Sequence, residues 1–152
     1  EVPLTRAMLV TFLWRAEGCP TPEGARDTAM FADVAEGMFY TEAVAWAAEN
    51  GIVCGYPDGN FGPDDIITRE QIAVILQRTA SYMEYSYPTN KDVSPDTFAD
   101  ASEISAYAVD GMRWAIESGM IIGDGEGCLD PLGDASRAES VTILSRFYES
   151  VR

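Results

Sequence analysis

The sequence predicts an all-α fold built from helix–loop–helix repeats. Apolar residues recur at helical spacing in several segments, hydroxyl residues stand where those helices would begin, and the same ordered blocks of residues occur more than once. A single helix–loop–helix unit cannot bury its apolar face alone, so we expect the units to pack on one another.

The composition is that of a globular protein with a strongly acidic surface. The chain has 152 residues, 47% of them hydrophobic, and a formal net charge of −15. Such a charge repels nucleic acid and anionic membranes, and no apolar run approaches the roughly 20 residues of a membrane-spanning helix. We therefore expect no nucleic-acid partner and no membrane insertion. An anionic ligand would need a pocket that gathers the few arginines.

The residue inventory also argues against metal, cofactor and enzyme chemistry. The chain has no His, and Cys19, Cys54 and Cys128 are widely spaced without a CxxC pair. Imidazole general bases and metal ligands are therefore absent, and the acidic turn near Asp58 lacks the spacing of a calcium-binding loop. We expect no cofactor, no metal, no disulfide scaffold and no catalytic residue.

Self-comparison reveals two whole repeats, preceded by the back half of another. In chain order we call the half-repeat the first repeat and the whole repeats the second and third repeats. Phe-Ala-Asp at 31–33 returns at 98–100, and residues 4–15 match residues 67–78. The predicted division is a C-terminal half-repeat at 1–16, whole repeats at 31–82 and 98–150, and linkers at 17–30 and 83–97.

Each whole repeat is expected to contain two helices joined by a turn. In the second repeat the helices are predicted at about 38–50 and 69–82, with turn residues at 56–63 between them. Short extended pieces are expected at 52–54 and 120–122. The predicted inner faces are Phe39, Ala43, Val44, Ala47 and Ala48; Ile72, Ile75, Leu76 and Thr79; and Val141, Ile143, Leu144 and Phe147 in the last repeat.

An arginine follows the hydroxyl residue at the start of each predicted second helix. The hydroxyl residues are Thr5, Thr68 and Ser136, and the arginines are Arg6, Arg69 and Arg137. Ser and Thr are good N-caps, and Gln71 and Glu139 stand where a capping box needs them, whereas Met8 does not fit that role. The positive end of the helix dipole disfavours an arginine in the first turn. Two explanations stay open: the arginines bind an anion, or they pair with a carboxylate of a neighbouring repeat.

The order of the motifs resembles that of the surface-layer homology (SLH) domain family. The motifs are Phe31-x-Asp33-Val34, Ala43-Val44-x-Trp46, Gly51-Ile52-Val53-x-Gly55, Asp58-Gly59-x-Phe61-x-Pro63 and Ile67-Thr68-Arg69-Glu70. The resemblance implies a pseudo-threefold bundle with ligand grooves between repeats. It further implies a non-catalytic, extracellular module that anchors an exported protein noncovalently to the bacterial cell wall. The implied ligand is a secondary cell-wall polysaccharide, often pyruvylated, whose negative charge meets the motif arginine.

The resemblance also implies the site residues, position by position. They are Arg6, Arg69, Arg137, Thr68, Ser136, Gly55, Gly123, Asp33 and Asp100, and we add Trp46 and Trp114 as residues that could stack on a sugar. Each has a structural alternative: a core position for the tryptophans, a helix cap for the aspartates and hydroxyls, and a positive φ for the glycines. The final Glu of the family motif is kept only at Glu139. We rank Arg6 below the other two arginines because its repeat lacks a front half.

A second function stays open, a protein–protein or self-assembly module in which the arginines pair with acids between repeats. The incomplete first repeat gives two structural expectations. Either a homo-oligomer completes it, or one side stays open and exposes Leu9, Phe12 and Leu13.

Overall fold

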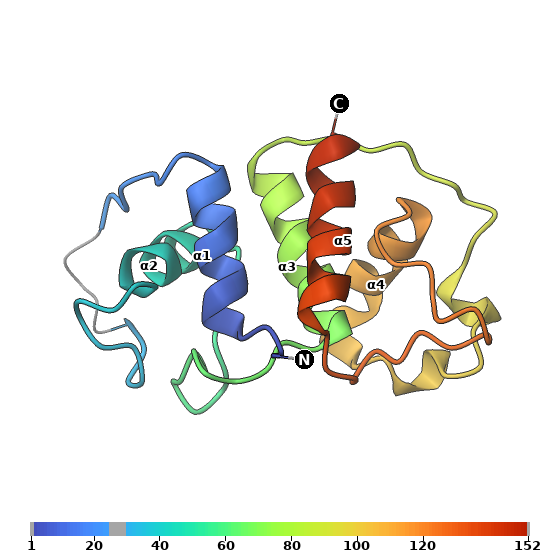
Figure 1. Cartoon of the computed structure of the whole chain (residues 1–152), viewed down its shortest axis with the longest axis horizontal. Coiled ribbons are helices and arrows are strands. Elements are labelled where there is room, and N and C mark those ends of the chain that lie inside the picture. The colour runs from blue at the N-terminus through green and yellow to red at the C-terminus, as the bar shows by residue number, and fades with distance from the viewer. Residues whose placement is uncertain (1, 25–29, 152) are drawn as a thin grey trace. The chain divides into compact units, whose positions relative to one another are not determined.

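The computed structural model describes residues 2–24 and 30–151, which contain five α-helices, short 3-10 helices and isolated β-bridges (Figure 1). Part of the predicted linker at 17–30 lies outside these residues. The helices are α1 (Arg6–Ala16), α2 (Thr41–Glu49), α3 (Arg69–Tyr82), α4 (Val109–Glu117) and α5 (Arg137–Glu149). No strand forms in the described ranges, not even at 52–54 or 120–122, so the predicted all-α class is confirmed.

The helices belong to two compact units, each of which combines parts of two sequence repeats. One unit spans residues 4–67 and packs α1 on α2; the other contains residues 68–151 with 2–3 and packs α3 on α4 (Figure 1). In both units the second helix of one repeat therefore packs on the first helix of the next repeat. The repeat boundaries stay a prediction, because the packing does not follow them.

Backbone hydrogen bonds join α1 and α3 to the turn of the following repeat. The Arg6 and Ala7 amides donate to the carbonyls of Asp65 (2.9 Å) and Pro63 (3.1 Å). At the start of α3, the Arg69 amide donates to the Gly133 carbonyl (3.1 Å) and the Glu70 amide to the Pro131 carbonyl (2.9 Å). These bonds satisfy first-turn N–H groups that no intrahelical carbonyl can reach.

The hydroxyl residues initiate the second helices as predicted. Thr68 Oγ1 accepts from the Gln71 amide while Gln71 Oε1 accepts from the Thr68 amide, and Ser136 and Glu139 form the same capping box. Thr5 accepts from the Met8 amide and receives no bond in return from a side chain at that position. Helix initiation therefore accounts for Thr68 and Ser136 without a ligand.

Two parts of the predicted inner faces are wrong. Phe39 precedes α2, which begins at Thr41 rather than near residue 38, and its side chain is 54% exposed. Val141 on α5 is 61% exposed. The remaining predicted residues of the second helices, Ile72, Ile75, Leu76, Thr79, Ile143, Leu144 and Phe147, are buried.

The expectation of an open side at α1 is also wrong for two of its three residues. Leu9 and Leu13 are fully buried and only Phe12, at 46%, is exposed. The physical reason is that α1 packs on α2 of the following repeat, so the half-repeat at the start of the chain has a partner within its own unit.

A phenylalanine packs against the turn glycine in both whole repeats. Gly55 has φ +72°, and a Cβ built there would lie 2.3 Å from Phe31 Cε1; at Gly123 (φ +82°) the distance to Phe98 Cε1 would be 2.7 Å. The phenylalanine of the Phe-Ala-Asp motif can thus pack here only because glycine has no side chain. Close approach of a ligand is not required to explain these glycines.

Replacement of Gly55 by Ala should therefore cost more stability than replacement of Gly51. Gly51 also has a positive φ (+70°), but a Cβ added to it would have no other atom within 4 Å. We expect Gly51→Ala to cost about 1–2 kcal/mol for the left-handed backbone. Gly55→Ala should add about 1–3 kcal/mol for the clash with Phe31. Urea unfolding measures both, and equal losses would show that the Phe31 contact is unimportant.

Candidate functional site

Arg6 is buried in the turn of the second repeat. Its Nε donates to the Phe61 carbonyl at 2.9 Å, and its guanidinium carbon lies 4.8 Å from the ring centroids of both Tyr56 and Phe61. The residue is 6% exposed. Because a carbonyl and two rings occupy this guanidinium, it holds the turn in place and presents little surface to a ligand.

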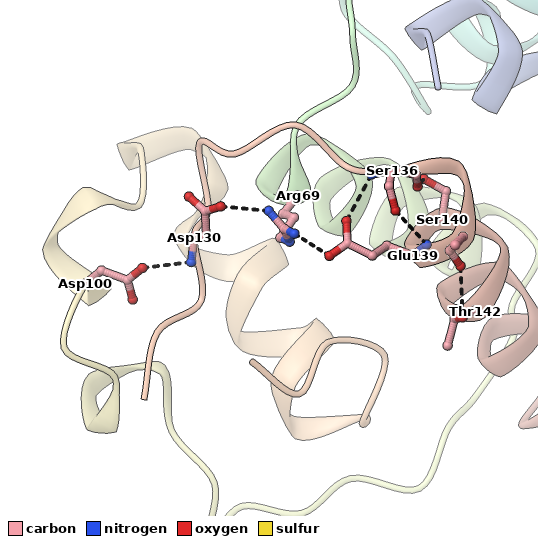
Figure 2. A network of polar contacts seen from close by, with 8 residues as sticks. Arg69, Asp100, Asp130, Ser136, Glu139, Ser140 and Thr142 are labelled. Atoms are coloured by element: carbon pink, nitrogen blue, oxygen red, sulfur yellow. Dashed lines mark hydrogen bonds and ion pairs between the residues drawn. The ribbon is translucent and has the colours of Figure 1, made fainter. Parts of the chain in front are cut away.

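Arg69 instead forms ion pairs with two carboxylates of the third repeat. Its Nη1 lies 2.9 Å from Asp130 Oδ2, and its Nη2 donates to Glu139 Oε1 (Figure 2). The Arg69 side chain is 20% exposed, whereas Asp130 and Glu139 are 63% and 43% exposed. The carboxylate-pairing alternative is therefore realised at Arg69, but both partners remain accessible to water and to a competing anion.

Asp33 and Asp100 hold the turns from which these contacts come. The two carboxylate oxygens of Asp33 accept from the Phe61 and Gly62 amides, both at 2.8 Å. Those of Asp100 accept from the Leu129 amide at 2.8 Å and the Asp130 amide at 2.7 Å (Figure 2). This role differs from the side-chain helix cap expected as the structural alternative, and the expected sugar contact stays a prediction. By fixing the Asp130 backbone, Asp100 also positions the carboxylate that faces Arg69.

A groove of about 400 Å³ lies beside Arg69 in the unit that contains α3 to α5. Its walls are the turn at 120–130 and one side of α5. Arg69 and Arg146 contribute positive charge, while buried Leu129 and Ile143 contribute apolar surface. The other lining residues are Met120, Ile121, Ile122, Gly123, Asp124, Asp130, Ala138, Glu139 and Thr142. The groove thus offers guanidinium donors, carboxylate acceptors and an apolar wall, the combination that a substituted sugar can use.

Hydrogen bonds hold the groove's acidic groups in their charged form. Burial raises the pKa of Glu139, but the Ser136 amide and the ion pair with Arg69 outweigh it, so the pKa is lowered from its ordinary value. The pKa of Asp124 is lowered chiefly by hydrogen bonds from the Cys128 and Glu126 amides. At neutral pH a ligand therefore meets ionised carboxylates at Glu139 and Asp124, and an anionic group has to approach through the guanidinium side.

The two tryptophans that were expected to stack on a sugar, Trp46 and Trp114, lie in different environments. Trp46 is 2% exposed in the core, which contradicts its expected role in stacking on a sugar. Trp114 is partly buried and packs edge-on against Tyr87 and Phe147, with ring centroids 5.7 Å and 6.4 Å away. Neither tryptophan lines the groove beside Arg69. Arg137 lies exposed at the start of α5 and does not line it either.

Sequence reasoning missed two parts of this region. Asp130 and Arg146 line the groove, yet only the folded chain brings them near Arg69. Glu70 is 2% exposed and accepts from the Ser105 amide (2.9 Å), the Ser105 hydroxyl (2.6 Å) and the Tyr107 hydroxyl (3.2 Å). The other copies have Ala at this position, so the repeat pattern carries no signal for it.

Neither a metal site nor a membrane helix is found where the chain is described. No group of three or more His, Cys, Asp or Glu side chains within 2–24 and 30–151 is arranged to hold a metal ion. None of the helices in those ranges has the length and apolar character needed to cross a bilayer.

Comparison with known proteins identifies one domain family. Residues 31–73 and 97–139 match the model of the S-layer homology domain, which together is more than half of the chain.

Several relatives align with most of this chain. Cell surface glycoprotein 1 of Acetivibrio thermocellus is 27% identical over 98% of this chain and 6% of its own length. The Surface-layer 125 kDa protein of Lysinibacillus sphaericus is 31% identical over 80% of this chain and 10% of its own. Exoglucanase XynX of Acetivibrio thermocellus is 36% identical over 78% of this chain and 11% of its own length. The chain therefore corresponds to only 6% to 11% of the length of these relatives.

The Arg69–Glu139 ion pair should make stability depend on pH. Glu139→Gln keeps the capping box, as Gln71 does in the preceding repeat, but removes the charge that faces Arg69. We expect the variant to be less stable at pH 7 by about 1 kcal/mol or less, because the pair is partly exposed. A lowered pKa means that this contribution is present above the ordinary Glu pKa and is lost as pH falls through the folded-state value.

Urea titrations at pH 7 and at about pH 3 should therefore show the two proteins converging in the acid. A stability difference that stays constant between these pH values would contradict the role assigned to the ion pair.

Proposed function

The chain belongs to the S-layer homology domain family, and on that premise we propose that it anchors a larger exported protein by noncovalent binding of a secondary cell-wall polysaccharide. Domains of this family are non-catalytic modules that anchor S-layer and other surface proteins to the cell wall. Their place is therefore the cell surface. Relatives named as enzymes, such as Exoglucanase XynX, share only a small part of their length with this chain, and their catalytic names are not carried over.

The groove beside Arg69 is our candidate for the polysaccharide site. The observation that carries it is a partly exposed guanidinium, held in place by carboxylates at a groove wall, in a chain whose net charge otherwise repels anions. Asp130 is 63% exposed, so its ion pair is worth little and can be exchanged for a ligand.

A carboxylate on the sugar, such as a pyruvate ketal, would suit Arg69. A guanidinium binds a carboxylate through two parallel hydrogen bonds, and the sugar's apolar face could rest against Leu129 and Ile143. Asp124 is an ionised acceptor for sugar hydroxyl groups at the other side of the turn. Arg6 is not proposed as a ligand contact because its guanidinium is buried. Gly123 forms part of the groove wall. Thr68, Ser136 and Arg137 stand at the starts of their helices and are not proposed as ligand contacts.

One observation favours the second candidate, a structural or self-assembly module. Both carboxylates that pair with Arg69 belong to the following repeat, so the arginine can serve to join repeats. Under that function, loss of Arg69 would lower stability and leave association with the wall unchanged.

Replacement of Arg69 by Ala separates the two functions. We expect binding to purified cell-wall polymer to weaken by about 10- to 100-fold, because a hydrogen bond to a charged group contributes roughly 1.5–3 kcal/mol. The melting temperature should fall by no more than about 4 °C, since the ion pairs that are lost are partly exposed. Isothermal titration calorimetry and thermal unfolding provide the two measurements.

Arg113→Ala is the matched control, because Arg113 is exposed on α4 and outside the groove. It removes the same charge and should leave binding unchanged. If Arg69→Ala bound the polymer as tightly as the parent and lost several times more stability than Arg113→Ala, the structural module would be the better account.

A further inference from the structure

The turns of the second and third repeats carry an aspartate and a glycine in exchanged positions. The second repeat has Gly62 and, three residues later, Asp65. The third repeat has Asp130 at the first of these positions and Gly133 at the second. In each turn a Cβ on the glycine would overlap the carboxylate of the aspartate. The two repeats therefore place the one carboxylate of this pair at different positions.

The position of the carboxylate decides which group it binds. Asp65 Oδ2 accepts a hydrogen bond from the Tyr56 hydroxyl at 2.9 Å. Asp130 Oδ2 instead lies 2.9 Å from Nη1 of the motif arginine Arg69. A Cβ at Gly133 would lie 2.7 Å from that Nη1, so the glycine makes room for the arginine as well as for the aspartate. The turn of the third repeat is thus shaped around the ion pair.

Asp130 adopts a backbone conformation that favours glycine. Its φ is +49°, and its counterpart Gly62 has φ +73°. The left-handed region is unfavourable for a residue with a Cβ, although Asp and Asn tolerate it better than others. On conformational grounds alone glycine suits this position better, and an outlier of this kind supports a hypothesis of function. The carboxylate of Asp130 therefore needs an explanation other than turn formation.

The two carboxylates that pair with Arg69 are held differently (Figure 2). Glu139 is also fixed by the capping box, since its Oε2 accepts from the Ser136 amide at 2.9 Å. In the part of the chain that the structure describes, the carboxylate of Asp130 accepts a hydrogen bond from Arg69 alone, and it is 63% exposed. Asp130 can rotate away from Arg69 without breaking any other bond. It is therefore the carboxylate that the acid group of a ligand would replace.

We propose that Asp130 is a specificity-determining residue, because its carboxylate occupies the Nη1 donor of Arg69 and competes for it with the acid group of an anionic sugar. The inference rests on the proposed function of the groove beside Arg69. Such competition lowers the affinity for a ligand that carries a carboxylate. It leaves the affinity for a neutral sugar unchanged, because a neutral sugar has no acid group to place on this donor. Asp130 therefore sets the difference in affinity between charged and neutral forms of the polymer.

The test replaces Asp130 by Asn, which tolerates the left-handed backbone and lacks the charge. Sodium pyruvate, titrated at constant ionic strength, is the first probe, and the Nε–H resonance of Arg69 is the readout. We expect the half-saturating pyruvate concentration to fall by about two- to fivefold, because the competing ion pair is exposed and weak. Asp130→Gly, which copies Gly62 of the second repeat, should give the same gain and is the independent second variant.

Asp134→Asn is the matched control. Asp134 is exposed, follows the same turn and does not line the groove, so its replacement changes the net charge equally and should leave the pyruvate titration unchanged. An equal gain in this control would reduce the effect to general charge repulsion and would overturn the proposal. So would a half-saturating concentration that stays the same or rises in both Asp130 variants.

Wall polymer provides the second measurement and separates this inference from the proposed function. By isothermal titration calorimetry, both Asp130 variants should bind pyruvylated polymer about two- to fivefold more tightly than the parent, and depyruvylated polymer no differently. If neither the parent nor the variants bound the polymer, the proposed function would be wrong, and the pyruvate titration would still decide whether Asp130 competes for Arg69. If the parent bound pyruvylated polymer and the Asp130 variants bound it no more tightly, the proposed function would stand and this inference would fail.

Discussion

The structure depends on the attachment of α1 and of α3 to the turn of the repeat that follows each of them. The first two amides of α1 and α3 donate to turn carbonyls, and Asp33 and Asp100 hold those turns in shape. The same attachment satisfies the amides at the helix start, brings an apolar helix face onto the next first helix, and places the motif arginine beside the turn. Helix, turn and candidate site are thus consequences of one constraint.

Two residue differences in the turn give Arg6 and Arg69 separate environments. The second repeat has Tyr56 and Gly62 where the third has Asp124 and Asp130. The Tyr56 ring lies on the Arg6 guanidinium, which turns inward to the Phe61 carbonyl. Without that ring, and with a carboxylate available at Asp130, Arg69 stays at the surface of a groove. One motif arginine therefore stabilises a turn, while the other keeps its guanidinium at the surface of the groove.

Local signals in the sequence predicted the local structure well, and failed where distant residues decide. The bounds of α3, the two capping boxes and the repeat order follow from spacing along the chain. The arginine partners could not be predicted, because Asp130 meets Arg69 only after the turn of the next repeat has folded. Arg6 was ranked below Arg69 and Arg137 because its repeat lacks a front half. Its environment, however, comes from the following repeat. For Trp46 the sequence left a core position and a sugar contact open, because composition cannot tell a buried position from a groove wall.

The role of Arg69 is tested most directly by observing its guanidinium during ligand binding. NMR titration of the arginine Nε–H resonances with purified pyruvylated wall polymer follows Arg6 and Arg69 separately in one sample. If Arg69 binds the ligand, its signal shifts on saturation while the signal of Arg6, bonded to the Phe61 carbonyl, stays in place. Polymer binding that leaves Arg69 unchanged, or that shifts Arg6 instead, would contradict that role.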